Sequence, residues 1–199
     1  AIMDRADPEK KVALLVDEWG AWYGVEKGTN PRFLYQQQTV RDAVLAALNL
    51  NIFIDNCERV RFANLAQVVN VLQSVALTEP DGGRMVLTPT WDVFKLYAAH
   101  HEARRLPVKI ETPQLSHENK CFPQVSATAS LAADGSVTVT LCNTDPANEV
   151  DMDLTLAGIA GRKLTAQVLS SPELTACNSF DQPRTVTTRT LEGASMDGD

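Results

Sequence analysis

The residues best suited to chemistry stand at 17–23, where the chain reads DEWGAWY. They directly follow a continuous apolar run at 12–16, which predicts a strand buried on both faces, as in a parallel sheet. The C-terminal ends of such strands are where ligands bind and catalysis occurs. A carboxylate delivered there among aromatic rings suits sugar chemistry, because it can attack or stabilise an oxocarbenium centre. On position alone, the alternative that Asp17 and Glu18 are polar residues closing a strand, with core aromatics around them, stays open.

The elements that must position these residues change in type near Pro107. Ten of the twelve aromatic residues precede Pro107, and twelve of the seventeen threonines follow it. This shift predicts an α/β part followed by an all-β part. Within the first part we expect a strand at 12–16, a helix at 34–50, a strand at 59–66 and a stretch without clear period at 67–77.

A last helix of the first part is expected before Pro107. Thr90 is a suitable N-cap and Asp92 lies in the predicted first turn. Arg104 and Arg105 lie in the predicted last turn, where positive charge suits the helix dipole. Pro107 is expected to end the helix.

The second part shows alternating apolar and polar residues typical of antiparallel strands. Asp134-Gly135 is a hairpin signal between the first two of these strands. The pattern predicts a β-sandwich or jelly roll. The expected strands are 125–131, 137–141, 150–156, 164–168 and, more weakly, 184–191.

Charge and hydropathy exclude some partners. The 199 residues carry a formal net charge of −7, which argues against nucleic-acid binding, since that needs clustered Lys and Arg. Apolar runs such as 12–16 fall far short of the roughly 20 residues of a membrane span. The polar, acidic start does not read as a signal peptide, which favours a cytoplasmic location.

Metal and thiol chemistry finds little support. The four cysteines form no C-x-x-C pair and are interpreted as ordinary thiols. His100, His101 and His117 have no carboxylate or cysteine at ligand spacing, so we expect solvated histidines and no metal site.

Residues 16–23 (VDEWGAWY) resemble the nucleophile strand of glycoside hydrolase family 51, the α-L-arabinofuranosidases. Residues 59–71 (RVRFANLAQVVNV) resemble the eighth barrel strand of that family and the segment after it, and 35–43 (YQQQTVRDA) resemble the intervening helix. The resemblance covers about residues 9–108. It departs at Gly20, where many members carry asparagine, and this departure bears on substrate contacts rather than on the class of reaction.

The resemblance implies roles for three residues. Glu18 matches the catalytic nucleophile. Gln67 matches a glutamine that binds the arabinofuranose, and an amide offers sugar hydroxyls both donors and an acceptor. Trp22 matches an aromatic that lines the site toward the leaving group. Trp19 and Tyr23 are interpreted as packing residues.

The expected fold follows from the resemblance and the length. Two βα units cannot close an eight-stranded barrel, which takes about 250 residues. Residues 1–106 are expected to be the last two βα units of a TIM (β/α)8 barrel. Residues 107–199 are expected to be an appended β-sandwich, jelly-roll-like and lacking its last strand. The chain is then a fragment of a larger protein.

The implied activity is a retaining hydrolysis that releases terminal α-L-arabinofuranosyl residues from arabinoxylan, arabinan and derived oligosaccharides. The family's acid/base is a glutamate in an Asn-Glu pair placed before the nucleophile. The pair at Asn148-Glu149 comes after it and is taken as a coincidence, so a second polypeptide segment must supply the acid/base. We expect no cofactor and a homo-oligomer. The alternatives are a retaining endo-glucanase of the same clan and a non-catalytic carbohydrate-binding β-sandwich.

Overall fold

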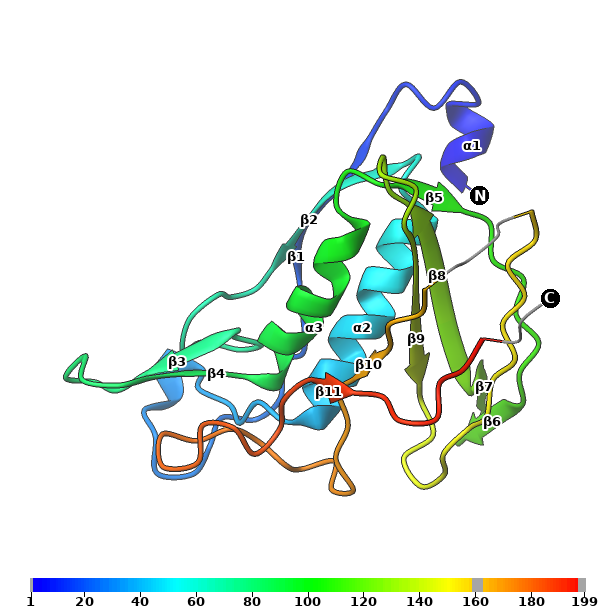
Figure 1. The fold of residues 1–199 in the computed structure, drawn as a ribbon. Coiled ribbons are helices and arrows are strands. Elements are labelled where there is room, and N and C mark those ends of the chain that lie inside the picture. The colour runs from blue at the N-terminus through cyan, green and yellow to red at the C-terminus, as the bar shows by residue number, and fades with distance from the viewer. Residues whose placement is uncertain (1, 159–162, 197–199) are drawn as a thin grey trace.

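Two parallel strands, β1 (Leu14–Trp19) and β2 (Val60–Leu65), lie side by side in the computed structural model, which describes residues 2–158 and 163–196 (Figure 1). β2 confirms the strand expected at 59–66. β1 begins two residues later than the apolar run and continues through Asp17 and Glu18. Both carboxylates therefore lie within the strand, where the pairing is irregular between Val16 and Trp19, rather than just after it.

The helix between the strands, α2 (Val40–Asp55), begins and ends later than the predicted 34–50. Thr39 is its N-cap, and the backbone N–H of Thr39 donates to Asp42 Oδ2 at 2.8 Å. Such a capping box fixes where a helix starts. The residues just before it do not continue the helix, because two of the three glutamine side chains at 36–38 bond other parts of the chain.

The N-cap of the second helix, α3 (Pro89–Tyr97), lies two residues earlier than the cap predicted at Thr90. The N-cap is Thr88, and proline occupies the first turn, where a missing N–H costs nothing. A short 3-10 helix, η2 (Ala98–His100), extends α3.

Arg104 and Arg105 do not lie in a last helical turn, as predicted, but in a strand. Glu102 has a φ of 56°, which turns the chain out of the helix. β5 (Arg104–Leu106) then pairs antiparallel with β8 (Val125–Leu131). The boundary at 106/107 stays a prediction, and β5, which precedes it, belongs to the sheet of the second part.

The helices α2 and α3 cover one face of the parallel pair (Figure 1). At its centre the ring of Trp19 packs against Phe53 and Phe94. Leu15 of β1 and Phe62 of β2 are paired across the two strands, and their side chains are 61% and 52% exposed. The described residues therefore bury one face of the parallel pair, and burial on both faces, expected for the strand at 12–16, is not reached with these residues alone.

A hairpin of β3 (Ala76–Thr78) and β4 (Met85–Leu87) follows β2 and was not predicted. Its turn contains Asp81, Gly82 and Gly83, a signal that sequence reasoning overlooked.

The second part is built around an antiparallel sheet in the order β5-β8-β9, with β9 at Val137–Asn143. Asp134-Gly135 makes the turn between β8 and β9, and Gly135 has a φ of 86°, so the predicted hairpin is confirmed. Along α2, this sheet lies on the side away from the parallel pair (Figure 1).

Polar side chains join the helices to this sheet. Asn51 of α2 donates to Ser126 Oγ at 3.0 Å and accepts from the hydroxyl of Tyr97 at 2.7 Å. Thr128 of β8 donates to Asp55 at 2.7 Å. These bonds fix the β part against the α/β part.

The remaining elements are short. They are α1 (Ile2–Ala6), η1 (Pro31–Phe33), β6 (Gln114–His117), β7 (Lys120–Pro123), β10 (Gln167–Val168) and β11 (Arg189–Thr190). The strand expected at 150–156 is irregular, and those at 164–168 and 184–191 shrink to two residues each. Leu154 and Leu156 are exposed, so this segment has no partner sheet in the described chain that would bury an apolar face. The β-rich character is confirmed; a complete sandwich is not formed by the described residues.

Candidate active site

Glu18 and Gln67 lie at the C-terminal ends of neighbouring parallel strands. Glu18 is the penultimate residue of β1, and Gln67 follows β2 by two residues. The backbone N–H of Ala66 donates to the carbonyl of Trp19 at 2.8 Å, which joins the two strand ends. Both side chains are exposed. The structure thus brings a carboxylate and a carboxamide to the same edge of the parallel pair.

The two tryptophans beside Glu18 have opposite environments. Trp19 is 8% exposed, with its ring centroid 5.4 Å from that of Phe53 and 6.1 Å from that of Phe94. This confirms its interpretation as a packing residue. Trp22 is 70% exposed, so its ring is free to contact a ligand at this edge.

Tyr23 is covered by a cation. The guanidinium carbon of Arg41 lies 3.7 Å from the centroid of the Tyr23 ring, a cation–π contact. Arg41 also reaches Asp42 at 3.3 Å. One face of Tyr23 is therefore occupied by protein, which favours the packing role expected for it.

Two buried glutamines that sequence reasoning did not single out hold the backbone of this segment. Gln73 Oε1 accepts from the N–H of Ala21 at 2.7 Å. Gln36 Nε2 donates to the carbonyl of Ala21 at 3.0 Å, and its Oε1 accepts from the N–H of Tyr23 at 2.9 Å. The run of three glutamines ahead of the Thr39 cap was the available signal for Gln36; the sequence carries none for Gln73.

Gly20 is required by its backbone and by its neighbours. It has a φ of 143°, which side chains of L residues rarely adopt. A Cβ at this position would lie 3.2 Å from both the carbonyl oxygen of Ala66 and the Cβ of Gln73. The departure from asparagine noted at this position therefore matches a backbone that leaves little room for a side chain.

The loop between β1 and α2 is folded back against the start of α2, and burial raises the pKa of one group within it and of one beside it. Glu26 accepts from the backbone N–H of Gln37 at 3.0 Å. Burial, and then the nearby carboxylate of Glu26, raise the pKa of Tyr35. Burial likewise raises the pKa of Cys177, which bridges to Thr39. Neither group offers a ready anion to the site.

The three histidines have different environments, which was not expected. His100 lies between β8 and β9, with Nδ1 2.7 Å from Ser130 Oγ and Nε2 3.2 Å from Thr140 Oγ1. Burial lowers its pKa, partly opposed by the carboxylate of Asp55, so the prediction of a solvated histidine is wrong for His100. His101 and His117 are exposed, as predicted.

The described residues offer no cluster of three or more His, Cys, Asp or Glu that could hold a metal ion. Within the same ranges, no helix is both long and apolar enough to cross a membrane. Asn148 and Glu149 lie in the loop after β9, where the side chain of Asn148 donates to Asp145 at 3.1 Å. This loop belongs to the β part, not to the ends of β1 and β2.

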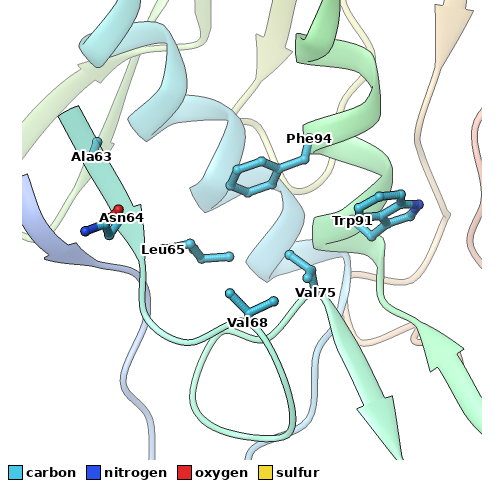
Figure 2. Close-up of a pocket in the computed structure, with 7 residues that line it drawn as sticks. All are labelled: Ala63, Asn64, Leu65, Val68, Val75, Trp91 and Phe94. Atoms are coloured by element: carbon cyan, nitrogen blue, oxygen red, sulfur yellow. The ribbon is translucent and has the colours of Figure 1, made fainter. Parts of the chain in front are cut away.

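An apolar pocket of about 410 Å³ opens between the end of β2 and α3 (Figure 2). In Figure 2 Phe94 of α3 points toward Leu65 of β2, with Val68 and Val75 below them. Neither Glu18 nor a charged residue lines it. Its lining suits the packing of apolar side chains rather than the binding of a sugar.

Known proteins resemble this chain along almost its whole described length. The family model for the α-L-arabinofuranosidase C-terminal domain matches residues 17–199. The intracellular exo-α-L-arabinofuranosidase of Bacteroides ovatus is 43% identical over 186 residues, which cover 93% of this chain and 36% of that protein. The crystal structure of the GH51 arabinofuranosidase from Xanthomonas axonopodis pv. citri is 44% identical, with a TM-score of 0.89 over 99% of this chain and 40% of that one.

A more distant structure, the arabinose complex of the Thermotoga maritima α-L-arabinofuranosidase, has a TM-score of 0.80 at 24% identity and shows the likeness of fold alone. It covers 96% of this chain and 40% of that one. The chain thus spans only 36–40% of the length of these relatives. By the match of the family model to residues 17–199 and by its 43% identical relative, the chain belongs to the α-L-arabinofuranosidase C-terminal domain family of glycoside hydrolase family 51.

Proposed function

We propose that this chain is the C-terminal part of a retaining glycoside hydrolase that releases terminal α-L-arabinofuranosyl residues from arabinoxylan, arabinan and derived oligosaccharides. The observation that carries the proposal is the placement of Glu18 and Gln67 at the C-terminal ends of adjacent parallel strands. That edge is where βα-barrel enzymes act. A relative named as an exo-α-L-arabinofuranosidase supports the choice of sugar.

The reaction proceeds by double displacement. The carboxylate of Glu18 attacks the anomeric carbon and forms a glycosyl ester while the bond from that carbon to the leaving oxygen breaks. A carboxylic acid about 5–5.5 Å from Glu18 protonates the leaving oxygen. The same group then removes a proton from water, whose oxygen attacks the anomeric carbon and frees Glu18. The reaction needs no metal or organic cofactor.

Gln67 and Trp22 bind the substrate on the two sides of the cleaved bond. The carboxamide of Gln67 donates to and accepts from hydroxyls of the arabinofuranose, the sugar present in every substrate. The exposed ring of Trp22 packs against the leaving group. Its contact matters most when that group is itself a sugar.

The acid/base and the rest of the barrel come from polypeptide outside this chain. Residues 1–106, apart from β5 at their end, form the last two βα units, and residues 107–199 form most of the appended sandwich without its last strand. Three observations support this arrangement: the paired residues Leu15 and Phe62 are exposed, the pocket beside Phe94 is open and apolar, and the relatives are longer. Exposed apolar surface of this kind is normally covered by a partner.

The compartment and the oligomeric state of the complete enzyme are two further proposals. We infer a cytoplasmic location because two relatives are named intracellular. The homo-oligomer stays a prediction, to be measured by light scattering on the complete enzyme.

The test replaces Glu18 in the complete enzyme and follows hydrolysis of an aryl α-L-arabinofuranoside. Glu18→Ala is expected to lower turnover by several orders of magnitude, and azide is expected to restore part of it as a glycosyl azide of inverted configuration. Asp17→Ala is the matched control, since Asp17 is an exposed carboxylate on the same strand, and it should retain most of the turnover. Near-normal turnover of Glu18→Ala without rescue would remove Glu18 from the role.

The same preparation separates the other interpretations. Hydrolysis of cellulose-type chains without hydrolysis of the arabinofuranoside would identify an endo-glucanase. Binding of a polysaccharide by the β part, with no hydrolysis of either substrate, would identify a carbohydrate-binding module.

A further inference from the structure

The segment after the Glu18 strand has an unusual set of backbone partners. Residues 20–23 form no regular secondary structure, yet Ala21 is only 7% exposed. Buried backbone N–H and C=O groups need hydrogen-bond partners. For Ala21 both partners are carboxamide side chains, Gln73 for the N–H and Gln36 for the carbonyl.

Gln73 joins three parts of the fold. It is fully buried, at 0% exposed, and both ends of its carboxamide are used. Oε1 accepts from Ala21 at 2.7 Å, and Nε2 donates to the carbonyl of Asp42, in the first turn of α2, at 2.8 Å. An uncharged carboxamide supplies a donor and an acceptor together. Gln73 therefore fixes the segment after β1 against the start of α2.

Gly20 makes this support necessary. Trp19 is held by its packing in the core, and Ala21 is held by Gln73. Between them stands Gly20, with a φ of 143° and no side chain to restrict it. Without the bond at Ala21 the chain could turn at Gly20, which would move Trp22 and would remove the anchor that follows the end of β1, where Glu18 lies. The side chain of Gln73 also packs against Gly20, because a Cβ added to Gly20 would lie 3.2 Å from the Cβ of Gln73.

We propose that Gln73 is a positioning residue that holds Glu18 and Trp22 in their working geometry; this inference rests on the proposed function. It touches the main chain three residues beyond Glu18 and one before Trp22, not the substrate. Loss of its bonds is expected to lower kcat for the aryl arabinofuranoside by about 100-fold, the effect of a displacement on the order of 1 Å. KM for this small substrate should change far less.

The test compares Gln73→Met with Asn51→Leu in the complete enzyme. Each variant replaces a buried carboxamide, whose oxygen and nitrogen both form hydrogen bonds, by an apolar side chain of similar size. Asn51 lies in the seam between α2 and the β8–β9 sheet, bonded to Ser126 and Tyr97. Both variants should lower the melting temperature. Only Gln73→Met should lower kcat, while Asn51→Leu should keep it within about twofold of the parent enzyme.

Gln73→Glu adds a readout that a merely structural role does not move. A protonated carboxyl group can accept from Ala21 and donate to Asp42 as the carboxamide does, whereas a carboxylate cannot donate. Burial raises the pKa of a carboxyl group, so the protonated fraction of the introduced glutamate increases as the pH falls. The ratio of kcat for Gln73→Glu to that of the parent enzyme should therefore rise with falling pH, while the ratio for Gln73→Met stays flat. If Gln73→Met does not fold, this ratio decides alone.

The outcomes separate the inference from the proposed function. A parent enzyme without activity on the arabinofuranoside contradicts the proposed function. An active parent enzyme with equal kcat losses in Gln73→Met and Asn51→Leu, or with no loss in either, contradicts the positioning role. A kcat ratio for Gln73→Glu that is low and does not vary with pH contradicts it as well.

Discussion

Replacing Trp19 with alanine is expected to destabilise the protein strongly, whereas the same change at Trp22, three residues along, should have little effect on stability. Trp19 is 8% exposed and contacts the rings of Phe53 and Phe94, so it joins β1 to both helices. Trp22 is 70% exposed. The two substitutions remove the same atoms from the same stretch of chain, so burial is the chief difference between them.

The magnitudes follow from this difference in burial. Truncation of a buried tryptophan to alanine lowers the free energy of unfolding by about 3–5 kcal/mol. Surface substitutions such as Trp22→Ala change it by about 0.5 kcal/mol or less. Trp19→Phe is an informative third variant, because the indole N–H of Trp19 has no hydrogen-bond partner among the described residues. Phenylalanine keeps the ring contacts and loses no bond, so the cost falls to about 1–2 kcal/mol.

The assay is urea unfolding of the complete enzyme followed by far-UV circular dichroism, which does not depend on tryptophan fluorescence. The midpoint should fall most for Trp19→Ala, less for Trp19→Phe and hardly at all for Trp22→Ala. Equal losses for Trp19→Phe and Trp19→Ala would show that the indole makes a bond outside the described contacts. Equal losses for the two alanine variants would refute the assignment of Trp19 as the packing residue.

Two further predictions concern pH and substrate. Burial holds the pKa of His100 below its ordinary value of 6.5, so the unfolded chain takes up this proton first as the pH falls. Stability should therefore decrease from about pH 6.5 downward until His100 is protonated in the folded state, with a slope of at most about 1.4 kcal/mol per pH unit. Thermal melts should show this decrease and should lose it in His100→Gln; an unchanged slope would contradict the assignment. Trp22→Ala should raise KM for arabino-oligosaccharides more than for aryl arabinofuranosides, and Gln67→Ala should impair both; an equal response of both substrates to Trp22→Ala would contradict its placement toward the leaving group.

The parts of the fold that the sequence predicted are those with a strong local signal. The apolar run before Asp17 and the stretch ending at Ala66 identified the parallel strands, and Asp134-Gly135 identified the hairpin. The start of α2 was missed because the glutamines before Thr39 carry no apolar period, and their role lies in contacts far along the chain. Arg104 and Arg105 were misplaced because pairing with β8 overrides their helical preference.

The sequence could indicate exposed candidate residues of the site but not the buried residues that support them. Glu18, Gln67 and Trp22 stand beside recognisable strand ends, so local pattern and resemblance proposed them, and their roles stay predictions. Gln73 is a glutamine in a stretch without periodicity, and only the folded chain shows that it reaches Ala21, 52 residues away. The segment 150–156 alternates apolar and polar residues as a strand does. Alternation alone does not form a strand without a neighbouring strand to pair with.

The central claim, that Glu18 is the nucleophile, is tested most directly by trapping the glycosyl-enzyme. The complete enzyme is incubated with a fluorinated arabinofuranosyl substrate that has a good leaving group and a slow second step, and is then digested and analysed by mass spectrometry. We predict that the peptide containing Glu18 gains the mass of one fluorinated sugar and that fragmentation places it on Glu18. A label on any other residue, or an active enzyme that accumulates no label, would contradict the claim.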